Sequence, residues 1–171
     1  MGRRMIFDVD VGVPAAVMYA DFTTERYWQD LVVFYEQHGA NAEIAHFSSG
    51  ERGTDIAFNH ILHATDLPVI ARAVVPSTFV VTREQHFEPF VPSVQQATGH
   101  YRAAVPVAPV DIRGEYLLAD TETGSRMRLQ TECTVRAPLI GGQIEQLVLG
   151  GLQTLFANEG EFTADWIAGH H

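Results

Sequence analysis

Apolar and polar residues alternate at the start of the chain, and the period changes to a helical one after Pro14. Residues 5–13, "MIFDVDVGV", put valine and phenylalanine side chains on one face and two aspartates on the other, which is typical of a half-buried strand. Apolar residues then recur three and four positions apart in residues 14–22 and about 24–39. The pattern therefore predicts one strand followed by two short helices.

After Gly39 the period returns to two, and the chain reads as a series of antiparallel strands with short turns between them. Residues 65–76 are more irregular and interrupt the series. The last two strands alternate most clearly and are joined by the turn "TETG". The predicted strands are residues 41–48, 54–63, 78–88, 99–105, 110–120 and 125–135.

A long amphipathic helix is predicted after the glycine pair at residues 141–142. Its apolar stripe is predicted to be Ile144, Val148, Gly151, Leu155, Phe162 and Trp166. Gly151 falls near the centre of this stripe, although a glycine inside a helix costs about 0.5–1 kcal/mol relative to alanine. Gly114 falls on the apolar face of its strand. The missing side chain of Gly151 allows either close packing of the helix on the sheet or an open volume between them. Gly114 either forms part of the wall of such a cavity or marks a bend in its strand.

This order of elements, from Met5 to about Ile167, resembles the START-like (SRPBCC) helix-grip superfamily of birch-pollen-allergen relatives, lipid-transfer domains and polyketide cyclases. The segments "DLP" (residues 66–68) and "PLIGGQIEQ" (138–146) are similar to an uncharacterised bacterial branch of it. The resemblance implies one α+β domain over residues 1–171. A curved antiparallel sheet of six to seven strands would wrap around the long C-terminal helix, with two short helices after the first strand. It also implies an apolar cavity between sheet and helix.

Alternation along the predicted strands selects side chains that would face this cavity. His60 is the best candidate for a general base, because it shares a face with apolar neighbours on its strand. A histidine in such a position is more often a buried group that is hydrogen-bonded to backbone or water. The predicted lining residues are Phe58, His60, Tyr101, Tyr116, Thr131, Val148, Gly151 and Leu155.

No metal site is predicted, because His60 and His63 lie three apart on a strand and point to opposite faces. No motif in the sequence calls for a cofactor. The 171 residues include 21 acidic residues and 11 arginines but no lysine, and the net charge of −10 argues against nucleic acid or an anionic membrane as a partner. The apolar stretches are too short for a stable membrane insertion. A single cysteine and an N-terminus without a signal-peptide pattern predict a cytoplasmic protein.

Three functional hypotheses follow from these patterns. The favoured one is a non-enzymatic protein, monomeric or homodimeric, that binds or transports a hydrophobic small molecule such as a lipid, a sterol or an aromatic polyketide-like compound. The first alternative is an enzyme resembling polyketide cyclases or aromatases, with His60 as general base. The second is a protein-interaction module whose core is packed without a cavity.

Overall fold

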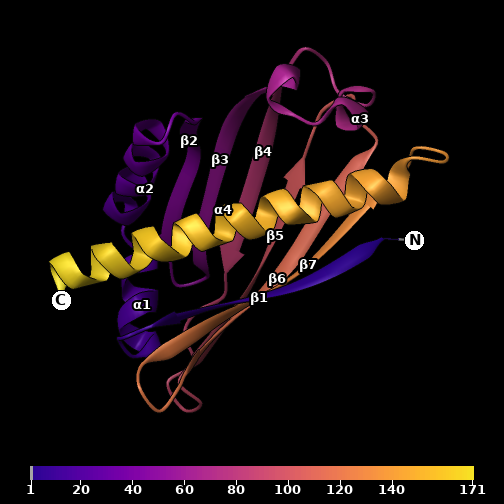
Figure 1. Ribbon diagram of the computed structural model, residues 1–171. Coiled ribbons are helices and arrows are strands. Elements are labelled where there is room, and N and C mark those ends of the chain that lie inside the picture. Colours follow the sequence, from indigo (N-terminus) through magenta and orange to yellow (C-terminus); the bar gives the residue numbers. More distant parts are fainter. Residues whose placement is uncertain (1) are drawn as a thin grey trace.

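The computed structural model describes residues 2–171 and contains a seven-stranded antiparallel sheet in the order β1-β7-β6-β5-β4-β3-β2 (Figure 1). The first strand pairs with the last, and the helices after β1 carry the chain to the opposite edge of the sheet, where β2 begins. The strands are β1 (Arg3–Val11), β2 (Asn41–Gly50), β3 (Gly53–His63), β4 (Thr78–Phe87), β5 (Gln96–Ala104), β6 (Val110–Asp120) and β7 (Ser125–Val135).

The longest helix, α4 (Gly141–His170), runs diagonally across one face of the sheet, which we call the inner face (Figure 1). Helices α1 (Ala15–Phe22) and α2 (Glu25–Gln37) lie near the C-terminal end of α4. The irregular segment contains the 3₁₀ turn η1 (Ala64–Asp66) and the short helix α3 (Val69–Arg72). The predicted α+β architecture is confirmed, with a curved antiparallel sheet around the C-terminal helix and two short helices after the first strand.

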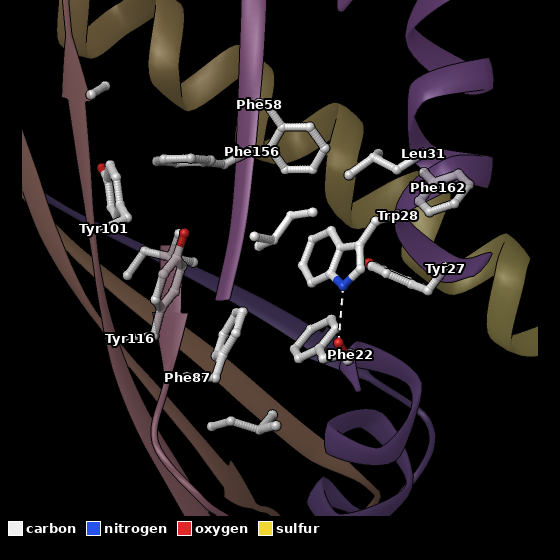
Figure 2. Close-up of a cluster of buried hydrophobic side chains, with 14 of the residues drawn as sticks. Phe22, Tyr27, Trp28, Leu31, Phe58, Phe87, Tyr101, Tyr116, Phe156 and Phe162 are labelled. Carbon is white, nitrogen blue, oxygen red and sulfur yellow. Dashed lines mark hydrogen bonds between the residues drawn. The ribbon is translucent and has the colours of Figure 1, made fainter. Parts of the chain in front are cut away.

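Aromatic side chains fill much of the space between the inner face, α1, α2 and α4 (Figure 2). Phe22 stacks on Trp28 and on Phe87, with ring centroids 5.4 and 5.0 Å apart. The indole Nε1 of Trp28 donates a hydrogen bond of 2.9 Å to the carbonyl of Phe22. This bond satisfies the one polar group of a side chain that is otherwise surrounded by rings.

Gly114 makes room for the ring of Tyr101 on the neighbouring strand. A Cβ atom at residue 114 would lie 2.1 Å from Cε1 of Tyr101, which no packing arrangement allows. The pairing of β6 with β5 and β7 continues without a register shift through Tyr101, Gly114 and Thr131. Gly114 therefore marks no β-bulge and leaves no open wall, because an aromatic ring covers it.

The predicted position of Gly151 on the apolar stripe of the last helix is wrong. Gly151 is exposed, and among residues 2–171 no atom other than its chain neighbours and the adjacent backbone of its own helix lies within 4 Å of the position its Cβ would take. The buried side of α4 instead passes through Leu149, Phe156 and Thr163. Gly160 approaches the sheet instead, since a Cβ there would lie 3.2 Å from Cγ1 of Val9, and so does Gly141 at the start of α4, where a Cβ would lie 2.5 Å from the carbonyl oxygen of Val135.

We expect the substitution Gly151→Ala to stabilise the protein by about 0.5–1 kcal/mol, because alanine restricts the unfolded chain and meets no atom in the folded one. Urea denaturation followed by circular dichroism measures the change. Gly160→Ala is the matched substitution and is expected to bring no such gain, because Val9 would have to shift. A destabilised Gly151→Ala variant would mean that Gly151 has a contact partner.

Candidate functional site

A small cavity of about 40 Å³ lies between the sheet, α1, α2 and α4. Since one water molecule needs about 10–15 Å³ of such space, the cavity has room for two or three waters. Most of its wall is apolar, and polar groups enter it from Gln85, Tyr116, Glu159 and Thr163. Its apolar wall includes Val9, Val11, Met18, Phe22, Trp28, Leu31, Phe87, Leu118, Met127, Leu129 and Phe156.

An ion pair between the sheet and α4 lies beside this cavity. Arg83 on β4 is only 3% exposed, and its Nη2 donates to Oε1 of Glu159 on α4 over 2.7 Å. The same nitrogen lies 3.3 Å from the hydroxyl of Tyr35 on α2, which donates a short hydrogen bond to Glu159. Burial lowers the pKa of Arg83, but the Glu159 carboxylate outweighs this effect and holds the pKa above its usual range. The guanidinium is therefore permanently charged.

The other two nitrogens of Arg83 have no hydrogen-bond partner. Neither Nε nor Nη1 meets an acceptor within the described chain, residues 2–171, although both are buried. The guanidinium carbon lies 5.2 Å from the centre of the Phe58 ring, an arrangement that favours a cation–π interaction. That interaction contributes attraction but leaves the two donors without acceptors.

His60 on β3 lies next to this ion pair. Its ring is 5.4 Å from the ring of Tyr35 and 6.0 Å from that of Phe58, and its Nε2 is buried without a partner among residues 2–171. Burial and then the nearby charge of Arg83 lower the pKa of His60 to about 3. His60 is therefore neutral at pH 7. A general base works best when its pKa is near the working pH, so His60 is poorly matched to that role.

Acid is expected to destabilise the protein through His60. Its folded-state pKa of about 3 lies below the ordinary value of about 6.5, so between these pH values the unfolded state binds more protons. Stability is full above pH 6.5 and falls as the pH drops. Between pH 7 and pH 5, His60 is expected to lower the free energy of unfolding by about 2 kcal/mol.

The measurement is urea denaturation of the protein and of His60→Phe at both pH values. The variant should lose about 2 kcal/mol less than the unmodified protein over this range. His63→Gln, which changes an exposed histidine on the same strand, should behave like the unmodified protein. Parallel losses in all three proteins would contradict the assignment.

The tyrosine hydroxyls on the inner face are paired with neighbouring side chains. The hydroxyl of Tyr101 is hydrogen-bonded to that of Thr131, and Tyr116 donates to Oε1 of Gln85 over 2.8 Å. Burial raises the pKa of Tyr101 to about 12 and that of Tyr116 well above its usual range. Both phenols are therefore neutral hydrogen-bonding groups rather than bases.

The strand residues selected from the sequence lie together on the inner face, and the helix residues do not all join them. Phe58, Tyr101, Tyr116 and Thr131 are buried, and His60 is half-buried. On α4, Val148 and Leu155 are half-buried at the edge of the packed side, and Gly151 is exposed. The prediction missed polar members of the site, among them Tyr35, Arg83, Gln85, Glu159 and Thr163.

Two patterns in the sequence pointed to the missed pair. Phe79, Arg83 and Phe87 have the same parity on β4, so a strand that buries both phenylalanines also buries the arginine. Glu159 follows Leu155 by four residues and precedes Phe162 by three, which puts a carboxylate on the apolar side of the helix. An inward arginine facing an inward glutamate is the pattern of a buried ion pair.

Residues 2–171 offer neither a metal site nor a membrane-spanning helix. They contain no group of three histidine, cysteine, aspartate or glutamate side chains arranged to hold a metal ion. Within the same residues, no helix has the length and apolar character needed to cross a membrane.

A curved sheet around one long C-terminal helix, with an aromatic and largely apolar space between them, defines the helix-grip fold. Norcoclaurine synthase from Thalictrum flavum, solved with dopamine and hydroxybenzaldehyde, shares it with a TM-score of 0.59 and 13% identity, over 100% of this chain and 89% of that one. Ara h 8.0201 has a TM-score of 0.53 and 14% identity, over 95% of this chain and 98% of that one.

The sequence itself places the chain in a family. It belongs to the family described as "Protein of unknown function (DUF2505)", which it matches over residues 7–167. It is also 31% identical over 122 residues to the uncharacterized protein Rv0481c of Mycobacterium tuberculosis, covering 70% of this chain and 69% of that protein. The comparisons show the family and the fold, and any function has to be inferred from the residues of the site.

Proposed function

We propose that the protein binds a small, largely apolar molecule between the inner face of the sheet and α4. The observation that carries the proposal is the cavity at this place, with apolar walls from the sheet and three helices and a few polar groups inside. Concave, mostly apolar clefts and cavities with a few polar groups are typical of small-molecule sites. Norcoclaurine synthase, which has this fold, was solved in complex with two small molecules that each contain an aromatic ring, dopamine and hydroxybenzaldehyde.

The size of the space favours aromatic molecules over lipids and sterols. A cavity of about 40 Å³ is smaller than a drug-sized ligand, so bound molecules must displace side chains or shift α4. Helix α4 contacts the sheet mainly at β1 and β7, and its side chains Val148, Leu152 and Leu155 are only half-buried. One or two fused rings need the smallest displacement, and they match the aromatic walls.

The enzyme hypothesis with His60 as general base receives less support. A neutral imidazole with a pKa of about 3 is a weak base at pH 7. Because Nε2 of His60 has no partner in residues 2–171, this side chain is better suited to a hydrogen bond with a bound molecule. We therefore favour a binding protein over a cyclase.

Native mass spectrometry of the purified protein, before and after organic extraction, tests the proposed function. The expected result is an adduct of one small molecule per chain that is removed by extraction. Naphthalene offered to the extracted protein should then bind in the same ratio. Absence of an adduct, together with no binding of naphthalene, would overturn the proposal and favour the packed interaction module.

A further inference from the structure

Two of the three side-chain nitrogens of Arg83 have no hydrogen-bond acceptor within residues 2–171. Glu159 and Tyr35 both engage Nη2, and Nε and Nη1 meet no acceptor within residues 2–171. A buried donor without a partner destabilises a protein by about 1–3 kcal/mol, and by more when the group is charged. Native proteins rarely contain such groups, and those that occur often mark a place for a water, an ion or a ligand.

His60 adds a third unpaired polar atom on the same face of the sheet. Phe58 pairs with Arg83 and His60 pairs with Val81, so His60 and Arg83 are diagonal neighbours across β3 and β4. Both side chains also border the rings of Tyr35 and Phe58. Neither side chain lines the cavity, so a ligand group reaches the free donors of Arg83 and the free nitrogen of His60 only by displacing the side chains that separate them from it.

The charges around this position select the kind of group. Glu159 already neutralises Arg83, and it lines the cavity that a ligand would enter. A second carboxylate would stand beside Glu159 in a space that water hardly reaches, and like charges repel strongly there. A ketone or hydroxyl oxygen accepts from Arg83 without adding charge, and a hydroxyl can also donate to His60.

We propose that the ligand is an uncharged aromatic molecule with a ketone or hydroxyl oxygen, and that Arg83, with His60 beside it, binds this oxygen. This inference rests on the proposed function and narrows it to a chemical class. It excludes fatty acids and aromatic carboxylates as the preferred ligands.

A set of four probes with the same ring system tests the inference. They are naphthalene, 2-naphthol, 2-acetylnaphthalene and 2-naphthoate, and their dissociation constants are measured by NMR titration at pH 7. Because a hydrogen bond to a charged group is worth a factor of about ten or more, 2-naphthol and 2-acetylnaphthalene should bind about tenfold more tightly than naphthalene. The 2-naphthoate anion should bind more weakly than either.

The variant Arg83→Met/Glu159→Gln removes both charges together and so avoids leaving one of them buried alone. It should lose the advantage of the two oxygen-bearing probes, so that these two probes and naphthalene bind the variant with affinities within about threefold of one another. Arg113→Met, which changes an exposed arginine on β6, should bind all four probes like the unmodified protein. Thermal unfolding of each variant verifies that it is folded.

The outcomes separate this inference from the proposed function. If naphthalene binds but the oxygen-bearing probes gain nothing, or keep their advantage in the double variant, the role of Arg83 is refuted and the binding function stands. If 2-naphthoate binds most tightly, the ligand class is wrong. If none of the four probes binds, the proposed function and the inference fail together.

Discussion

Replacing Glu159 with glutamine is expected to lower the free energy of unfolding by about 3 kcal/mol. The substitution keeps the shape of the side chain but leaves the charge of Arg83 without a counter-charge. Arginine cannot escape by losing its proton, because a guanidinium stays protonated in proteins even without a neighbouring carboxylate. The expected loss lies at the low end of the cost of breaking a buried ion pair, because the Glu159 side chain is 20% exposed.

Urea denaturation measures this loss, and two further variants test its cause. Glu161→Gln removes an exposed carboxylate from the same helix and should change stability by less than about 0.5 kcal/mol. The double variant Arg83→Met/Glu159→Gln should recover most of the loss, because no buried charge remains. If Glu159→Gln costs no more than Glu161→Gln, then water reaches Arg83 and the ion pair is not buried in solution.

The substitution Phe156→Ala is expected to cost about 3–5 kcal/mol. Phe156 on α4 is 2% exposed, and its ring lies 6.0 Å from that of Phe7 and 6.1 Å from that of Tyr101. Removing the ring enlarges the cavity, whose wall includes Phe156, and deletes its contacts with both strands. Denaturation by urea gives the cost.

The enlarged cavity also links stability to binding. Naphthalene should raise the melting temperature of Phe156→Ala more than that of the unmodified protein, since a ligand that binds only the folded state stabilises it. Leu147→Ala is the control on α4, because Leu147 is 40% exposed and its loss should change stability by less than about 0.5 kcal/mol. An equal cost for the two substitutions would mean that α4 is not packed on the sheet.

The strands and helices could be predicted because each has one apolar face. The apolar residues of 125–135 all have one parity, those of 110–120 do so apart from Leu117 and Ala119, and the structure has strands with the same bounds. The order of the strands in the sheet, with β1 and β2 at its two edges, could not be predicted from any local pattern. A strand alone does not record which edge of a sheet it occupies.

The site was harder to predict because its polar members face inward. On β4 the run "TREQH" is polar at every position, so the alternation is interrupted there and the burial of Arg83 and Gln85 can be inferred only from the parity of Phe79 and Phe87 on either side. On α4 the buried side contains Glu145 and Thr163. A helical wheel that counts only apolar residues therefore turned the stripe toward Gly151, away from Phe156. In both elements the buried side includes polar side chains whose partners are brought together only by the fold, and these side chains obscured the apolar pattern.

The central claim is that a small aromatic molecule binds between the inner face and α4. Intermolecular nuclear Overhauser effects between naphthalene and the methyl groups of the labelled protein test it most directly. We predict contacts with cavity-lining residues such as Met18, Leu31 and Leu118. Contacts with Ile6 and Leu117, which are 62% and 39% exposed on the outer face, or no contacts at all, would contradict the claim.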